Sequence, residues 1–152
     1  MLEIVYAHET WDKHQSCIFL AGPSPRGIEH YNWRPQAIEI LKRLEFNGAV
    51  FIPLPRDGNW LNDAEGQIAW ELKYLNRASS IAFWIPRDKD NLPGFTTNVE
   101  FGMFLKSRKI VLGYPPEAVK MGYLHTVAEM ESVPITTTLE ETLREAIKMA
   151  TF

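Results

Sequence analysis

Cysteine is nearly absent from this sequence, in which Cys17 is the single thiol among 152 residues. One cysteine cannot form an internal disulfide, and it makes a cysteine-based metal site unlikely to be present. Because an apolar run follows it, we expect Cys17 at the edge of the core. His8 and His14 are close in sequence, but nothing nearby completes a metal-ligand set. We therefore expect no metal and no organic cofactor.

Long apolar runs and basic clusters are also missing. No run approaches the ~20 apolar residues of a membrane-spanning helix. Residues 1–15 are mostly polar and charged, unlike a secretory signal peptide. The formal net charge is −3, and the lack of a basic block argues against a nucleic-acid polymer as the main partner. We expect a cytoplasmic protein that binds a small molecule, and a nucleoside or nucleotide is compatible with this charge.

The chain alternates apolar strands with amphipathic helices. Its 152 residues, 45% of them hydrophobic, fit one domain spanning 1–152. Alternating strands and helices predict an α/β fold with a doubly wound parallel sheet. We expect a flavodoxin-like, five-stranded sheet in the order 2-1-3-4-5, and a weak alternation over 2–7 allows a short edge strand. The five expected strands are 17–21, 49–52, 79–85, 110–113 and 133–136.

The segment 92–102 links the expected strand 79–85 to a helix and contains Glu100. We predict Glu100 in the first turn of that helix, at the carboxyl edge of the sheet, where open α/β folds bind ligands. The positive end of the helix dipole would keep the carboxylate ionised, as a nucleophile or an ion partner. The alternative is a capping box formed by Thr97 and Glu100, in which the glutamate only closes the helix start.

A second carboxylate is predicted on the helix that begins at Asn62 or Asp63 and continues to about residue 77. The apolar residues of this helix recur at spacings of four and three, at Ile68, Leu72 and Leu75. Glu71 flanks this stripe. It is either an ordinary residue at the boundary of the core or a second functional carboxylate.

Two loops at the same expected edge offer ligand contacts. The turn 22–27 combines glycines and prolines with Ser24 and Arg26. Its small residues would let a ligand approach the backbone, and Arg26 could meet a phosphate or carboxylate; the alternative is a plain rigid loop. The charged loop 86–91, which contains Asp88, is either solvated or a substrate lid. For Trp33 and Arg34 we favour packing at a helix start over closing on a substrate.

Three stretches, 18–23, 67–86 and 96–102, together resemble the nucleoside 2-deoxyribosyltransferase family, in its deoxyribosyltransferase-like branch, over about residues 17–124. The resemblance implies that Glu100 is the nucleophile and that an acidic residue near Glu71 contacts the nucleobase. It also implies substrate contacts at the turn that contains Gly22, and we include Phe19 and Asn98 among the expected substrate-binding residues. Two positions differ from the family pattern. Phe19 stands where members have a tyrosine that hydrogen-bonds the nucleophile. The segment 121–124 lacks the asparagine that hexameric members supply to the site of a neighbouring subunit.

Cleavage of an N-glycosidic bond needs a carboxylate for the sugar and an acid for the departing base. Glu100 suits the first task, and Glu71 or Asp88 the second. The leading interpretation is 2-deoxyribosyl transfer between nucleobases. The alternatives are an N-glycoside hydrolase of nucleosides or nucleoside 5′-monophosphates, favoured if Ser24 and Arg26 bind phosphate, and a non-catalytic nucleotide-binding sensor. Members of the family form dimers and larger rings, so the resemblance predicts a homo-oligomer, as do the many aromatic residues.

Overall fold

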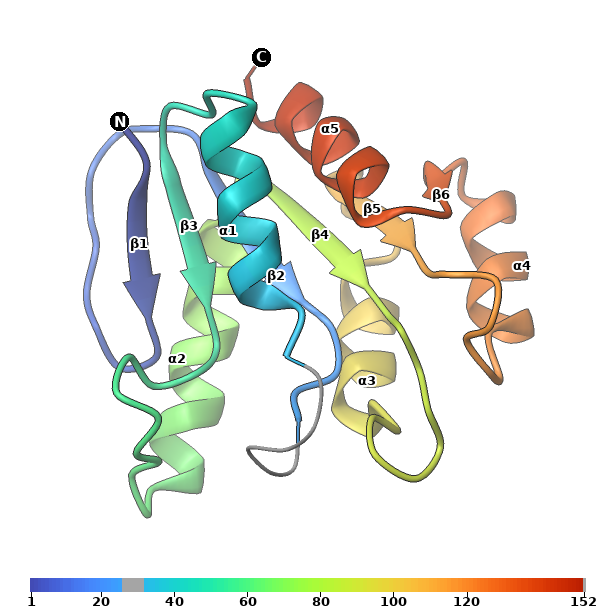
Figure 1. Cartoon of the computed structure of the whole chain (residues 1–152), viewed down its shortest axis with the longest axis horizontal. Helices are drawn as coiled ribbons and strands as arrows, with labels where there is room; N and C mark the ends of the chain where they lie inside the picture. The colour runs from blue at the N-terminus through green and yellow to red at the C-terminus, as the bar shows by residue number, and fades with distance from the viewer. Residues whose placement is uncertain (26–31, 152) are drawn as a thin grey trace.

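The computed structural model describes residues 1–25 and 32–151. At its centre is a six-stranded sheet in the order β1-β3-β2-β4-β5-β6, in which every neighbouring pair is parallel (Figure 1). All strand arrows therefore point to one edge, the carboxyl edge, where parallel α/β sheets bind ligands. The strands are β1 (Glu3–Tyr6), β2 (Cys17–Ala21), β3 (Ala49–Ile52), β4 (Ser80–Trp84), β5 (Ile110–Gly113) and β6 (Ile135–Thr136).

The predicted α/β class is confirmed, and the five expected strands lie in the expected order as β3, β2, β4, β5 and β6. The count of five is wrong, because Glu3–Tyr6 adds a sixth strand beside β3. Only Val5 of β1 is fully buried. An edge strand with one buried position has a weak sequence signal, and it forms here because β3 offers it a free row of backbone partners.

Helices cover both faces of the sheet, as a doubly wound fold requires. In Figure 1, α1 and α5 lie in front of the sheet and α2 and α3 behind it. The fully buried strands divide their side chains between these layers: Ile18 and Leu20 pack with α1 and α5, and Cys17 and Phe19 pack with α2. The helices are α1 (Arg34–Arg43), α2 (Ala64–Arg77), α3 (Phe95–Phe104), α4 (Gly122–Met130) and α5 (Leu139–Ala150).

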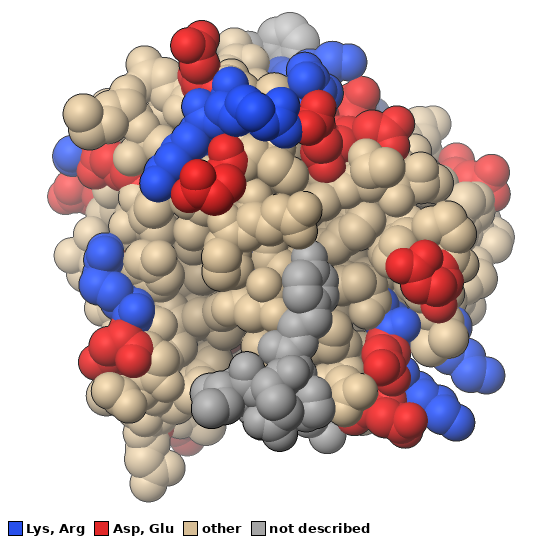
Figure 2. All heavy atoms as spheres, viewed as in Figure 1, with Lys and Arg blue, Asp and Glu red and all other residues tan. Residues whose placement is uncertain are grey.

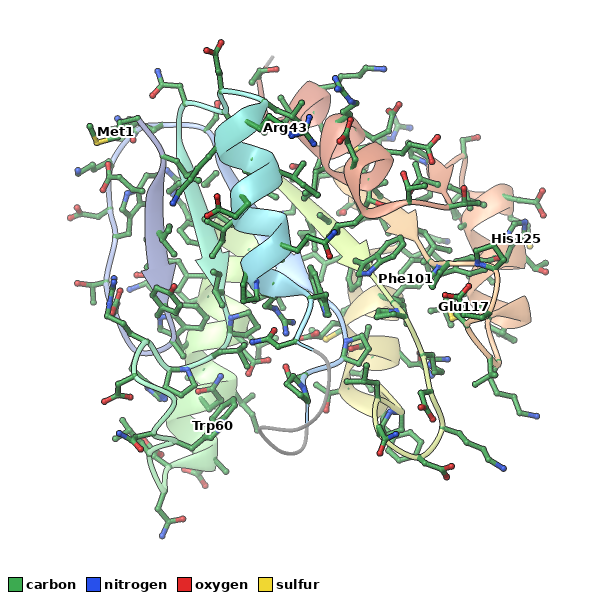
Figure 3. The ribbon with its side chains drawn as sticks, in the orientation of Figure 1. Met1, Arg43, Trp60, Phe101, Glu117 and His125 are labelled. Atoms are coloured by element: carbon green, nitrogen blue, oxygen red, sulfur yellow. The ribbon has the colours of Figure 1, made fainter. Side chains whose placement is uncertain are left out.

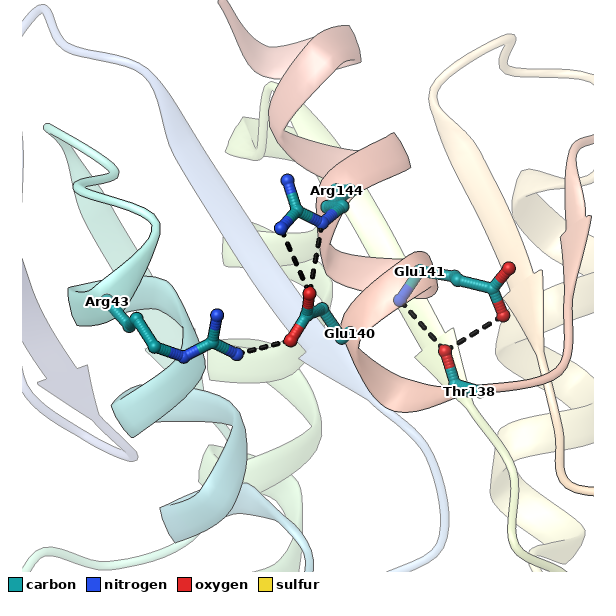
Figure 4. Close-up of polar contacts among 5 residues, drawn as sticks. All are labelled: Arg43, Thr138, Glu140, Glu141 and Arg144. Carbon is teal, nitrogen blue, oxygen red and sulfur yellow. Dashed lines mark hydrogen bonds and ion pairs between the residues drawn. The ribbon is translucent and has the colours of Figure 1, made fainter.

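Helix α5 is fixed to the sheet and to α1 by polar contacts. The hydroxyl of Ser80 on β4 donates to the carbonyl oxygen of Ala146, 2.7 Å away. Thr138 caps α5 by accepting from the backbone N–H of Glu141 at 3.1 Å. Arg43 of α1 and Arg144 of α5 both pair with Glu140 and lower the pKa of its carboxyl (Figure 4).

The buried face of helix α2 is rotated relative to the stripe that Ile68, Leu72 and Leu75 predict, although Leu75 is buried as expected. Ile68 is 58% exposed, whereas Trp70 and Tyr74 are buried. The aromatic side chains decide the rotation of the helix because they bury more area and have polar partners. Trp70 Nε1 donates to the Glu9 carbonyl at 2.8 Å, and Tyr74 Oη accepts from the backbone N–H of Trp11 at 2.9 Å. Glu71, one position after Trp70, consequently turns towards the carboxyl edge of the sheet.

Charged residues are dispersed over the face shown in Figure 2. Blue Lys and Arg atoms and red Asp and Glu atoms alternate around its rim, and a largely uncharged band crosses the middle. Within residues 1–25 and 32–151, no helix has both the length and the apolar character to cross a membrane. Among the same residues, no three His, Cys, Asp or Glu side chains gather as ligands for a metal ion.

The outer face of α3 is apolar and uncovered. Phe95, Val99 and Met103 are 74%, 62% and 57% exposed and recur every four residues. The helix has no lysine or arginine, and its one acidic residue, Glu100, is buried. An uncharged exposed stripe of this kind is typical of a contact between protein chains.

We predict that this stripe mediates self-association, with a second copy as the partner. Light scattering at micromolar concentration should give at least a dimer, and Val99→Lys should shift the protein towards monomer because it places a charge in the contact. Met130→Lys on α4, where Met130 is 74% exposed, serves as the matched control and should leave the mass unchanged. A strictly monomeric wild-type protein would contradict the prediction.

Candidate active site

A cavity of about 280 Å³ opens at the carboxyl edge of the sheet. Its walls come from the turn after β2, the loop after β3, helix α2, and the loop that leads into α3. A cavity of this size suits one small molecule. The lining residues are Gly22, Pro23, Ser24, Pro53, Trp60, Glu71, Pro93, Gly94, Phe95, Thr96, Thr97 and Glu100.

The turn after β2 forms one wall and depends on Gly22. The φ angle of Gly22 is +150°, and a Cβ at this position would lie 2.1 Å from the backbone oxygen of Trp84 on β4. No side chain can be accommodated there without moving the backbone. The turn therefore lies against the end of β4, and its backbone is accessible from the cavity.

Glu71 of α2 and Glu100 of α3 both line the cavity, and their carboxyl groups interact directly. Glu100 is 8% exposed. Burial, a hydrogen bond with Glu71 and the nearby Glu71 charge together raise the pKa of Glu100 to about 8, although the charge of Arg34 acts in the opposite direction. At neutral pH the pair therefore retains a proton. Gln67 holds Glu71 in place, because its Nε2 donates to Glu71 Oε2 at 2.7 Å and to the Pro53 carbonyl at 3.2 Å.

Arg34, at the first position of α1, lies beneath the turn and is 1% exposed. Its Nε donates to the Leu20 carbonyl at 3.1 Å, its Nη1 to Ser24 Oγ at 3.1 Å and its Nη2 to the Gly22 carbonyl at 2.9 Å. Burial lowers the pKa of Arg34 to about 10, and the charges of Glu100 and Glu71 oppose this shift. Arg34 thus fixes the turn and supplies positive charge to the two carboxyl groups.

The expected position and ionisation of Glu100 need correction. Helix α3 starts at Phe95, its N-cap is Gly94 with a φ of 66°, and no side chain caps it. Glu100 is therefore in the second turn, and the predicted capping box with Thr97 does not exist. The field of the helix start weakens beyond the first turn, so burial and the neighbouring carboxyl group dominate. They favour the protonated form of Glu100, not the ionised form that we predicted.

The cavity brings together four of the residues singled out from the sequence: Gly22, Ser24, Glu71 and Glu100. Arg26 lies outside the described residues. The other three predicted substrate contacts do not line this cavity. Phe19 is fully buried and packs against Trp70, Asp88 is exposed in the loop after β4, and Asn98 Oδ1 accepts from the Arg87 guanidinium.

Two residues at the site gave signals that the sequence analysis did not use. Arg34 stands in phase with the buried residues Ala37, Ile38 and Leu41 of α1. A charged residue in register with an apolar stripe indicates a buried and partnered charge. Trp60, in a polar loop before α2, is the second. An aromatic residue there has no core to enter, and the structure leaves it 56% exposed at the cavity.

Fold and cavity together define a parallel α/β protein with a paired carboxyl site at its ligand-binding edge. The comparison with protein families agrees: a family model described as nucleoside 2-deoxyribosyltransferase like matches residues 15–118. The chain belongs to this family, whose members are generally transferase-like enzymes. No curated protein sequence gives a significant match.

The raised pKa of Glu100 predicts how stability depends on pH. An ordinary glutamate ionises near 4.5, whereas Glu100 in the folded protein ionises near 8. Between these values the folded state binds more protons than the unfolded state, so the free energy of unfolding falls as pH rises from about 4.5 to 8. Glu100→Gln removes this loss, and at pH 8 we expect it to unfold with a free energy about 4 kcal/mol above that of wild type.

Urea or thermal unfolding between pH 4.5 and 9 measures this difference. Glu117→Gln, which changes an exposed glutamate, should follow the wild-type curve. At pH 4.5 the Glu100→Gln and wild-type proteins should have similar stability. Equal stability at pH 8 would show that Glu100 ionises normally in the folded protein.

Proposed function

We propose that the protein is a nucleoside 2-deoxyribosyltransferase that forms a covalent intermediate on Glu100. The observation that supports the proposal is the Glu71–Glu100 pair, which lines a small cavity and retains a proton at neutral pH. Breaking an N-glycosidic bond needs a carboxylate and an acid on neighbouring sites. One proton on two carboxyl groups provides both.

The first half-reaction transfers the sugar to the protein. An oxygen of the Glu100 carboxylate bonds to C1′ of the 2′-deoxynucleoside, the C1′–N bond breaks, and its electron pair stays with the base. Before the bond to C1′ forms, the proton held on Glu100 passes to Glu71 along the hydrogen bond between the two carboxyl groups, and Glu71 then donates it to the base nitrogen. The products are a glycosyl ester on Glu100, a carboxylate on Glu71 and a neutral free base.

The second half-reaction releases the sugar to an acceptor. A second nucleobase loses a proton to Glu71 and attacks C1′, and the ester bond to Glu100 breaks. Water in the place of the second base would give hydrolysis, which is the alternative activity. The cavity walls include prolines and aromatic residues against which a flat base can pack, and this lining supports transfer over hydrolysis.

The described cavity walls favour nucleosides over nucleotides. None of the described lining residues is a lysine or arginine. The guanidinium of Arg34 is nearby, but its three donor nitrogens already bind Leu20, Ser24 and Gly22. A 5′-phosphate would find hydroxyl and backbone N–H groups in the described walls, a weaker set than one with a free cation.

Glu100→Gln should lower glycosidic cleavage of deoxynucleosides roughly 1000-fold or more, because the amide cannot form the ester. Glu71→Gln should lower it roughly 100-fold or more through loss of proton transfer. Glu65→Gln changes an exposed residue in the first turn of the same helix and should leave the rate unchanged.

The assay incubates the protein with a deoxynucleoside and a different free base, followed by chromatography. A new deoxynucleoside indicates transfer, free deoxyribose indicates hydrolysis, and an unchanged mixture would favour the non-catalytic sensor. Trapping the sugar on Glu100 by mass spectrometry tests the covalent step. Near wild-type activity in folded Glu100→Gln would rule out Glu100 as the nucleophile.

A further inference from the structure

Trp60 differs from the other four tryptophans of the chain. Trp11, Trp33, Trp70 and Trp84 are all at most 7% exposed, whereas Trp60 is 56% exposed. Trp33 Nε1 donates to Pro23 and Trp70 Nε1 to Glu9. No ring contact or hydrogen bond is made by Trp60 within the described part of the chain. Leaving an indole in water is unfavourable, and covering it with another apolar surface regains that free energy.

The backbone around Trp60 is anchored on both sides. Before it, the N–H of Gly58 donates to Pro55 at 3.2 Å and the N–H of Asn59 donates to Asp57 Oδ1 at 2.9 Å. After it, Asp63 caps α2 by accepting from Gly66 at 2.9 Å. The exposed indole is thus presented by a short segment held between a turn and a helix cap. Figure 3 shows Trp60 near the start of α2, at the carboxyl edge of the sheet.

Trp60 lines the same cavity as Glu71 and comes from the adjoining part of the chain. Pro53 and Trp60 belong to the loop after β3, and Glu71 belongs to α2, the helix that follows this loop. Gln67 ties Pro53 to Glu71. A flat apolar surface therefore lines the same cavity as the carboxyl group that the proposed mechanism assigns to the leaving base.

We infer that Trp60 is the stacking surface of the nucleobase subsite: a planar purine or pyrimidine lies against the indole while its edge faces Glu71. The inference rests on the proposed function, which it extends to the way the base is held. Every nucleobase has a π face, so stacking on an indole binds purines and pyrimidines alike. Discrimination between bases is then left to the hydrogen bonds at the edge, and the protein should accept more than one base.

Binding of free adenine and free thymine tests the inference without requiring catalysis. Equilibrium dialysis should show that Trp60→Ala raises the Kd of both bases about tenfold or more, the range found for loss of one aromatic stacking partner. Trp60→Phe should retain part of the affinity. Leu61→Ala is the matched control, because Leu61 is 61% exposed and next to Trp60 but does not line the cavity.

Tryptophan fluorescence gives a second readout, since Trp60 is the one exposed indole of the five. With excitation near 295 nm, acrylamide should quench a component that Trp60→Phe lacks, and saturating adenine should protect that component. 2-Deoxyribose has no planar ring, so it should not protect the Trp60 fluorescence from acrylamide. It should also bind to Trp60→Ala and to wild type with the same Kd. The inference is overturned if adenine leaves the quenching unchanged, if Trp60→Ala binds bases as tightly as wild type, or if neither base binds.

These outcomes separate the inference from the proposed function. Glycosidic cleavage that continues with unchanged KM in Trp60→Ala overturns the stacking role and leaves the transferase proposal standing. The opposite result is that wild type cleaves no deoxynucleoside but still binds bases in a way that depends on Trp60. That result overturns the transferase proposal and leaves the base subsite standing.

Discussion

The buried charge of Arg34 is the constraint on which the rest of the site depends. A guanidinium removed from water needs acceptors, and here the carbonyl oxygens of Leu20 and Gly22 and the hydroxyl of Ser24 provide them. The central guanidinium carbon of Arg34, Cζ, also lies 4.5 Å from the centre of the Trp33 ring. Because these partners belong to β2, to the following turn and to α1, satisfying one side chain fixes the relative position of all three segments.

The same charge allows two carboxyl groups to approach each other. Glu71 and Glu100 repel when both are ionised, and burial of Glu100 adds to the cost. Arg34 reduces that cost, since both carboxyl groups stabilise its charge. A retained proton removes the remaining repulsion. A site of this kind reduces the stability of the fold at neutral and alkaline pH, but it places a proton close to an incoming substrate. Such a loss of stability is common at active sites.

The two sides of helix α3 belong to two different surfaces of the protein. Its inner side presents Glu100 to the cavity, and its outer side exposes Phe95, Val99 and Met103. Phe95 belongs to both, because it lines the cavity and is 74% exposed. A second copy bound to the outer side would therefore lie next to the entrance of the cavity, and self-association and substrate binding would act on the same helix.

Periodicity and turn residues predicted the α/β class, the order of the five main strands and the location of the site at the carboxyl edge. These features follow from local patterns: continuous apolar strands indicate a parallel sheet, and ligands bind at its carboxyl edge. The turn that contains Gly22 and Ser24 was predicted beside Glu100 for this reason, whereas Glu71 was proposed because it flanks an apolar stripe and because of the family resemblance. Local patterns could not predict the rotation of α2, which Trp70 and Tyr74 decide through contacts with residues some sixty positions away.

The protonation of Glu100 was likewise decided by the tertiary structure alone. The sequence places a glutamate near a helix start, which favours an ionised carboxylate. The folded chain instead brings Glu71 from α2 and Arg34 from α1 next to Glu100 and excludes water from it. Sequence alone therefore indicated two candidate carboxylates, Glu71 and Glu100, and the edge of the sheet at which the site lies. Their charge state was decided by the fold, because electrostatic energies depend on distance and burial and these are set by residues far apart in the chain.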